Sequence, residues 1–422
     1  MLLPEMESET AINLLAGTLR SLHLEHLIPK ERMLAHFYLS IKIHKLPLSA
    51  TRGITGATAF TFLGGAALEL HLILKSGLNY LLRTTWKGKC FRILNTDELL
   101  IRLSQLGTAA KSFYGFDFSS MYDRLKHESI LQNLTWFFAE WWSVKEDSNN
   151  VEYRIVKETA YNSKKKEVFY CLKKTESLDL KTKKASTTYT FHGVIDLLHM
   201  CIRCNLIHVS ELLFLQIIGI PQGSGASPMV ADIWCATHEV RFCRQRPEFI
   251  FHDTGRFMDD LISSVDLPVQ EIYGSLPIDR TCFNAVSTSF LDLEVATVNN
   301  RVVFKLFDKR RSFNFLLHRF TPKGTTIPNA SHSAHFKSAL IRAYRLNSFL
   351  HFFCYDMTDL IGTFLFNGTF AKDYIKTALV RITQKYFTGK WISNKNLFID
   401  RLNAFGLNVM SALTPTIINR KS

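Results

Sequence analysis

Residues 252 to 263 read HDTGRFMDDLIS and set two carboxylates next to each other. The flanking positions have the mostly apolar pattern of a buried hairpin: Arg256, Phe257, Met258, Leu261 and Ile262. Adjacent Asp259 and Asp260 repel each other, and a buried carboxylate without a partner is costly. The pair therefore indicates a bound cation or a catalytic task, and a solvated turn is the plain alternative.

The bulk composition describes a large globular protein with an excess of positive charge. The chain has 422 residues, of which 47% are hydrophobic, so we expect two or three domains or subdomains. The formal net charge of +14 predicts a polyanionic partner, either nucleic acid or an anionic membrane surface. Glu69, His71 and Lys75 interrupt the apolar stretch 57–82, which therefore predicts a buried helix rather than a membrane span. The acidic N-terminus is not typical of a secretory signal, and we expect a soluble intracellular protein.

Eight cysteines are scattered along the chain and do not predict a disulfide framework. Cys201 and Cys204 form a C-x-x-C pair between His199 and His208. A zinc site needs further ligands from a second element, and the sequence offers no matching pair. We therefore interpret these cysteines as packing residues.

The coarse element pattern is a mixture of helices and strands without a regular βαβ rhythm. Residues 9–35 predict a helix, 113–118 (FYGFDF) a short strand, and the segment after it a turn and a helix. Residues 144–190 alternate between polar, lysine-rich runs and strand-like runs, which predicts an exposed hairpin insertion. Its lysines are typical of a solvated face, or of a binding surface if the protein handles nucleic acid.

The C-terminal half follows the same mixed pattern. After residue 190 we expect a helix, the loop GIPQGSGASP (219–228) and another helix to about residue 245. The runs FLDLEV and RVVFKLF predict a strand pair, and the last hundred residues predict helices. Together these elements predict an α+β fold with helical flanks.

Three signals occur in a fixed order: Asp117 at a strand end, the Gly/Ser/Pro loop, and the Asp259–Asp260 pair. Each alone has an ordinary explanation, respectively a helix cap, a loop and a surface turn. Nucleotide polymerisation needs two divalent ions, and carboxylates from two strands can bridge them. Mg²⁺ prefers hard oxygen ligands and shares its coordination with substrate phosphates. The three signals together therefore indicate a polymerase site.

These segments also resemble a known family. DFSSMYD, GIPQGSGASP and FMDD resemble motifs A, B and C of reverse transcriptases. The stretch LQIIGIPQGSGASP is especially similar to telomerase and its sister group, the Penelope-like retroelements. YLSIKIHKLPLSATRGI resembles the Penelope-like "LPKIHK…RPI" segment, and FLDLEV with LFDKRRSFNFL resembles that family's FLDL and "YRKPT…YL" run. The matches span residues 38 to about 345.

The resemblance implies a right-hand polymerase fold with fingers, a palm containing an antiparallel sheet, and a helical thumb. It places an N-terminal helical extension at 1–35 and the fingers at 36–110. The palm is expected at 111–320, with a fingers insertion near 144–205, and the thumb at 321–422. Neither a GIY-YIG nuclease pattern nor a telomerase RNA-binding domain is visible, so we expect a minimal polymerase without its own target-cleaving activity.

The resemblance also implies roles for the acidic residues and their neighbours. Asp117, Asp259 and Asp260 would be catalytic and would hold two Mg²⁺ ions, with Mn²⁺ as an alternative. Tyr122 would contact the sugar of the nucleotide and exclude a 2′-hydroxyl. The backbone of the residues after Asp117 would face the triphosphate: Phe118, Ser119, Ser120 and Met121.

The remaining implied contacts come from the loop and from the fingers. Gln222, with Gly223 and Ser224, would lie beside the incoming nucleotide and the template. Lys42 and Arg52 would clamp the triphosphate, with Lys45 as a weaker candidate. The family's RPI is Arg52-Gly53-Ile54 in this chain, and its Pro before the first Lys is Ile41.

The implied function is RNA-directed DNA polymerisation, in which a primer 3′-hydroxyl is extended with dNTPs on an RNA template. The expected partners are the RNA template, the DNA primer duplex and dNTPs, with no membrane, and the expected location is the nucleus. A maturase-like or structural RNA-binding protein on the same fold is the alternative, which the intact acidic set disfavours. An RNA-directed RNA polymerase usually has GDD and a polar residue at the position of Tyr122, so we rank it lower.

Overall fold

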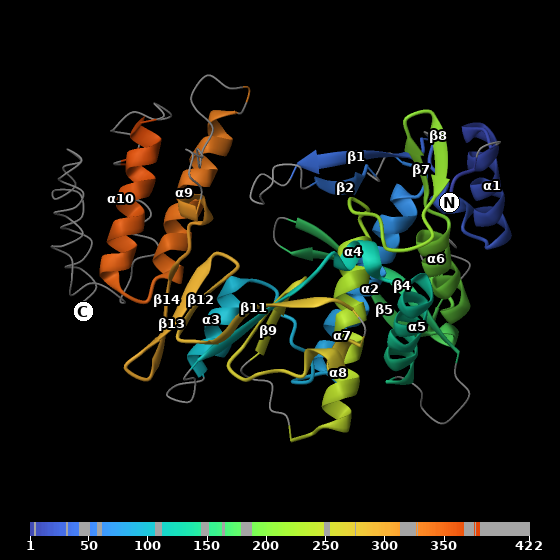
Figure 1. Ribbon diagram of the computed structural model, residues 1–422. Coiled ribbons are helices and arrows are strands. Elements are labelled where there is room, and N and C mark those ends of the chain that lie inside the picture. Colours follow the sequence, from blue (N-terminus) through green and yellow to red (C-terminus); the bar gives the residue numbers. More distant parts are fainter. Residues whose placement is uncertain are drawn as a thin grey trace. The chain divides into compact units, whose positions relative to one another are not determined.

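A computed structural model (Figure 1) gives the structure of the protein. It describes residues 1–3, 6–30, 33–41, 51–56, 61–105, 112–144, 152–162, 165–178, 188–248, 254–274, 276–312, 326, 328–366, 375 and 377–379. The chain divides into two compact units. The first comprises Met1–Arg92, Phe116–Leu261 and Leu267–Arg280, and the second Ile93–Gly115, Ile262–Asp266 and Thr281–Ser422. The domain boundaries expected from the resemblance stay a prediction.

Four helices form the core of the first unit: α2 (Gly64–Arg83), α5 (His127–Ser143), α6 (Phe191–Arg203) and α7 (Ser227–Gln245). The buried helix expected within 57–82 is confirmed as α2, whose inner face includes Leu70 and Leu74. A Cβ on Gly77 would lie 2.5 Å from the ring of Trp141, so glycine permits the close approach of α2 and α5. None of the described helices is both long and apolar enough to span a bilayer.

The N-terminal helix is shorter than the sequence predicts. α1 covers Ser8–Ser21 and is followed by the 3-10 turn η1 (Glu25–Leu27), so the expected helix over 9–35 is wrong beyond Ser21. His23 adopts a φ of +56°, and the Leu24 amide donates to the Leu19 carbonyl at 2.7 Å. A left-handed residue just past the last turn is a common helix stop, and it ends α1 here.

A mixed sheet lies beside these helices in the first unit. It has the order β2-β1-β7-β8, built from β1 (Ala35–Ile41), β2 (Thr51–Thr55), β7 (Leu206–Val209) and β8 (Leu212–Leu215). β1 pairs antiparallel with β2 and parallel with β7. A Cβ on Gly53 would lie 2.7 Å from the ring of Phe37, so the glycine at this position makes room for that ring.

The expected insertion hairpin is confirmed. β4 (Tyr153–Asn162) and β5 (Lys165–Lys174) pair antiparallel, β6 (Thr188–Tyr189) joins β4, and β5 packs on α2 (Figure 1). Glu69 of α2 is buried and accepts hydrogen bonds from the hydroxyls of Tyr170 and Tyr189 and from Lys157 Nζ, the last at 2.9 Å. Burial and the charge of Glu69 raise the pKa of both phenols. Lys157 is therefore used to fix the insertion to α2.

A second four-stranded sheet has the order β11-β3-β10-β9. Its strands are β3 (Phe113–Phe118), β9 (Thr254–Phe257), β10 (Asp260–Ser263) and β11 (Ile278–Ala285). The sequence prediction of a strand at 113–118 and of a hairpin around FMDD is confirmed. The short helices α4 (Met121–Arg124) and α8 (Val269–Tyr273) follow β3 and β10 along the chain.

In its described residues, the second unit contains a three-stranded sheet and three α-helices. β12 (Ser287–Phe290), β13 (Leu293–Val298) and β14 (Arg301–Leu306) are antiparallel, which confirms the expected strand pair. The described helices of this unit are α3 (Thr96–Gln105), α9 (Asn329–Leu346) and α10 (Leu350–Phe366). Buried Asn347 accepts from the Leu306 amide at 3.2 Å and donates to Asp356 at 2.8 Å, so it ties the α9–α10 connection to β14. Both helices agree with the expected helical C-terminal part.

Candidate active site

The end of β3 lies against the turn of the FMDD hairpin. β9 and β10 are joined by Met258 and Asp259, and Met258 has a φ of +57°. The Phe118 amide donates to the Asp259 carbonyl oxygen at 3.1 Å. Asp117 directly precedes Phe118, and Asp260 is the first residue of β10. The structure therefore brings together, at the ends of two neighbouring inner strands, the two segments whose carboxylates the sequence singles out.

The three acidic residues differ in burial from their neighbours. Asp117, Asp259 and Asp260 are each partly exposed, whereas Phe116, Phe118, Leu261 and Ile262 are buried. Among the residues that the structure describes, no three His, Cys, Asp or Glu side chains form a group that could hold a metal ion. Mg²⁺ is commonly held by one or two carboxylates together with substrate phosphates, so hard oxygen donors from adjacent segments fit this ion. The metal-binding roles of the three aspartates stay a prediction.

Tyr122 lies near the hairpin and near a basic strand residue. Burial raises the pKa of its phenol to about 12; the negative charges of Asp259 and Asp232 act in the same direction, and the positive charge of Arg52 opposes them. The phenol is therefore neutral at physiological pH. Tyr122 is the second residue of the short helix α4, and the residue that precedes this helix, Ser120, has a φ of +55°.

The Gly/Ser/Pro loop is fastened to two other segments of the site. The Ile220 amide donates to the Tyr122 carbonyl at 2.7 Å, and the Thr55 amide of β2 donates to the Gln222 carbonyl at 2.8 Å. The Gln222 side chain donates to Asp123 at 3.2 Å. The loop thus links the turn after β3 with strand β2.

Two glycines make these contacts feasible. Gly223 has a φ of +123°, and a Cβ there would lie 2.1 Å from the Thr55 carbonyl oxygen. Gly219 has a φ of +76°, and its Cβ would lie 2.5 Å from the Tyr122 carbonyl oxygen. Both backbone conformations and both close approaches to a neighbouring backbone favour glycine.

Two of the backbone amides expected to face the triphosphate are donors within the protein. The Phe118 amide binds Asp259, and the Ser119 amide donates to the Pro277 carbonyl at 3.0 Å. The Ser119 hydroxyl also donates to Asp279. The Phe118 ring is buried and forms an edge contact with Tyr273 at 4.8 Å between centroids. The predicted triphosphate contact therefore rests on the amides of Ser120 and Met121.

The fingers residues are only partly described. Arg52 is exposed on β2, opposite Ser40 of β1. Lys42 and Lys45 lie outside the described residues. Of the implied triphosphate clamp, the structure therefore places Arg52 alone, as a cation that acts on Tyr122.

A buried ion network beneath the hairpin was missed by the sequence analysis. Arg256 is fully buried and binds Asp232 through Nη1 at 2.9 Å and Glu239 through Nε. Arg92 binds the other carboxylate oxygen of Asp232. A signal was present in the sequence, because Asp232 and Glu239 are seven residues apart in α7 and therefore share one face of a largely buried helix.

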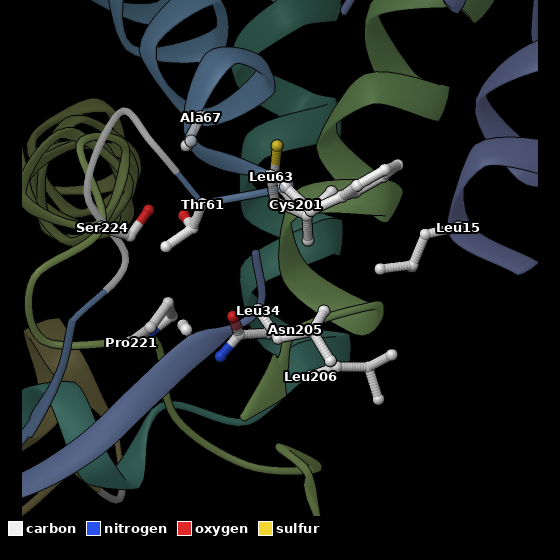
Figure 2. A pocket seen from close by; sticks show the side chains of 13 residues that line it. Leu15, Leu34, Thr61, Leu63, Ala67, Cys201, Asn205, Leu206, Pro221 and Ser224 are labelled. Atoms are coloured by element: carbon white, nitrogen blue, oxygen red, sulfur yellow. The ribbon is translucent and has the colours of Figure 1, made fainter. Parts of the chain in front are cut away.

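Figure 2 shows a small cavity in the first unit, on which two residues of the Gly/Ser/Pro loop border. Its volume is about 20 Å³, room for about one water molecule, which excludes it as a nucleotide site. Leu15, Cys201, Pro221 and Ser224 are among the residues that line it. Burial raises the pKa of the Cys201 thiol to about 12, so the cysteine is an inert packing residue at neutral pH.

Comparison of the sequence with protein-family models and with curated proteins gives no match. Among solved structures, the chain is similar to the telomerase of Candida albicans in complex with the TWJ fragment of telomeric RNA. The two are 14% identical with a TM-score of 0.57, over 98% of this chain and 66% of that one. The apo telomerase of Candida tropicalis is 13% identical with a TM-score of 0.45, over 96% of this chain and 66% of that one.

The first of these likenesses identifies the fold. The chain has the α+β right-hand polymerase fold that the resemblance implied, and it spans about two thirds of the length of the telomerase chain. At 14% identity the structural similarity supports the fold alone and no more specific activity. The expected relationship to telomerase and to Penelope-like elements stays a prediction.

Proposed function

We propose that this protein is an RNA-directed DNA polymerase, a reverse transcriptase that extends a primer 3′-hydroxyl with dNTPs on an RNA template. The hydrogen bond from Phe118 to the Asp259 carbonyl, at 3.1 Å, is the observation that carries the proposal. It sets Asp117 beside the tandem aspartates on a polymerase fold. Tyr122, whose phenol the charge of Asp259 affects, would contact the nucleotide sugar, and Gln222, which donates to Asp123, would lie beside the base.

Asp117, Asp259 and Asp260 are the residues that would hold two Mg²⁺ ions, or Mn²⁺ in their place. When bound, such ions supply activation of the primer hydroxyl and neutralise charge on the departing pyrophosphate. The protein itself would contribute by positioning the nucleotide. The neutral, half-buried Tyr122 presents an aromatic ring that would block a ribonucleotide 2′-hydroxyl, and Arg52 adds a fixed cation for the triphosphate.

The nucleic-acid partners belong to the same proposal. A net charge of +14 suits an RNA template paired with a DNA primer, whose phosphates provide the matching negative charge. The similar telomerase of Candida albicans was solved with telomeric RNA, which supports RNA as a partner here. We further propose membership of the group that joins telomerase to the Penelope-like retroelements, and a nuclear location.

The test is template-dependent dNTP incorporation on poly-rA and on DNA templates, with Mg²⁺ and Mn²⁺ compared. Asp259→Ala should abolish extension while nucleic-acid binding stays within about twofold, because the change removes a carboxylate and leaves the basic surfaces intact. Asp266→Ala serves as the matched control, since Asp266 is an exposed carboxylate just after β10. Extension that survives Asp259→Ala contradicts the proposal.

The same experiment separates the alternatives. Mg²⁺-independent filter binding to one RNA, with no incorporation of any nucleotide by the wild type, would favour a maturase-like or structural RNA-binding protein. Incorporation of rNTPs in preference to dNTPs would favour an RNA-directed RNA polymerase.

A further inference from the structure

Arg256 connects the buried ion network directly to the FMDD hairpin. Its side chain is fully buried, and its Nη1 atom donates both to Asp232 Oδ1 at 2.9 Å and to the Met258 carbonyl oxygen at 3.1 Å. Nη2 donates to the Asp232 carbonyl at 3.3 Å, and Nε binds Glu239. One planar guanidinium therefore contacts α7 and the turn between β9 and β10 at once.

The acidic and basic side chains of the network around this guanidinium balance one another in charge. Asp232 and Glu239 face Arg256 and Arg92, two acids against two bases. Glu239 also accepts from the Tyr273 hydroxyl at 2.9 Å and from the Phe91 amide at 2.8 Å. Burial opposes the charged form of Arg256, but the neighbouring acids, Glu239 foremost, raise its pKa well above the usual value. The guanidinium is therefore a permanent, fixed cation.

The contact with Met258 falls on a hairpin residue that has a left-handed backbone conformation. A non-glycine residue with a φ of +57° costs conformational energy and persists only when its surroundings hold it in place. Arg256 holds the carbonyl of the peptide that precedes Asp259, and the Phe118 amide holds the carbonyl of Asp259 itself. Asp259 is thus fixed on both sides of its Cα atom.

We propose that Arg256 is a positioning residue for nucleotidyl transfer. Its guanidinium group fixes the plane of the Met258–Asp259 peptide. The Asp259 carboxylate is thereby aligned with Asp117 before the substrate binds. This inference rests on the proposed polymerase function. It differs from a merely stabilising ion pair, because it predicts a loss of turnover that exceeds the loss of stability.

Arg256→Lys is the central variant, because lysine keeps the charge but cannot contact Asp232, Glu239 and the Met258 carbonyl together. Glu69→Gln is the control: like Arg256, Glu69 is a buried charged side chain with several hydrogen-bond partners, but it fixes the insertion instead of the hairpin. The readouts are urea unfolding, kcat and KM for dNTP, and hydrogen–deuterium exchange of residues 254–263 in the free protein.

For Arg256→Lys we expect kcat to fall about 10- to 100-fold, KM to change less, and exchange in the hairpin to rise at least about fivefold. Glu69→Gln should lose stability, with kcat within about twofold and hairpin exchange unchanged. Equal kcat losses in both variants, or unchanged hairpin exchange in Arg256→Lys, would overturn the proposal.

A milder variant keeps the test decisive if Arg256→Lys does not fold. Tyr273→Phe removes only the hydroxyl that donates to Glu239 and keeps the ring that packs on Phe118. It should raise hairpin exchange and lower kcat by a smaller factor, about 2- to 10-fold. If the wild type incorporates no nucleotide, the polymerase function fails, while the exchange measurement still decides whether Arg256 fixes the turn.

Discussion

Replacement of Gly223 by alanine should loosen the link between the Gly/Ser/Pro loop and strand β2. The new Cβ would lie 2.1 Å from the Thr55 carbonyl oxygen, a backbone atom that cannot rotate away. The φ of +123° adds a strain of about 1–3 kcal/mol for an L-residue. Relief of the overlap separates Gln222 from Thr55 and breaks the bond between them, a further loss of about 0.5–1.5 kcal/mol. The total destabilisation is about 1.5–4.5 kcal/mol.

Gly225→Ala is the matched control, two residues along the same loop. Its Cβ would meet its nearest neighbour, Leu68, at 3.9 Å, an ordinary van der Waals distance. The assay is the free energy of unfolding in urea together with KM for dNTP. Gly223→Ala should lower the free energy of unfolding. It should also raise KM for dNTP about tenfold or more, because Gln222 is displaced from the nucleotide. Equal behaviour of the two variants would refute the reasoning.

Three shorter predictions follow from other contacts. Tyr122→Ala should reduce the preference for dNTPs over rNTPs at least about tenfold in competition assays, because the neutral ring no longer blocks a 2′-hydroxyl. Burial lowers the pKa of His238, packed on Trp234, from 6.5 to about 4. Between pH 7.5 and 5 the folded state therefore binds fewer protons than the unfolded state, so the free energy of unfolding should fall by about 2 kcal/mol as the pH is lowered across this range. In urea titrations at the two pH values, His238→Gln should remove that loss. Gly77→Ala should lower the unfolding free energy by about 0–2 kcal/mol, since overlap with Trp141 outweighs the gain in helix propensity.

The local elements were predictable wherever a short segment carries its own pattern. FYGFDF and the FMDD hairpin alternate or group their apolar residues as strands do, and both occur at the expected residues. The N-terminal helix was overestimated because apolar residues continue past its end, while the stop depends on the left-handed conformation of His23. A glycine after the helix would have predicted a left-handed residue at this position, whereas a histidine does not.

The assembly of the site was predictable only through the order of its motifs. No local pattern pairs Phe118 with Asp259, because that hydrogen bond joins segments far apart in the chain. The ion network was missed for a similar reason: Arg256 could be noted beside the acidic pair, but its partners Asp232 and Glu239 lie on a helix that precedes it. Their spacing indicated a common face and left open what that face contacts.

The sheet order has a consequence for synthesis of the protein on the ribosome. β3 lies between β10 and β11, and both neighbours are translated long after it, β10 beginning at Asp260 and β11 at Ile278. Until they emerge, the nascent chain has both edges of β3 without their native partners, a state that invites aggregation. A message truncated before codon 259 therefore encodes a fragment that has Asp117 but neither of the tandem aspartates, and in which both edges of β3 lack their native partners.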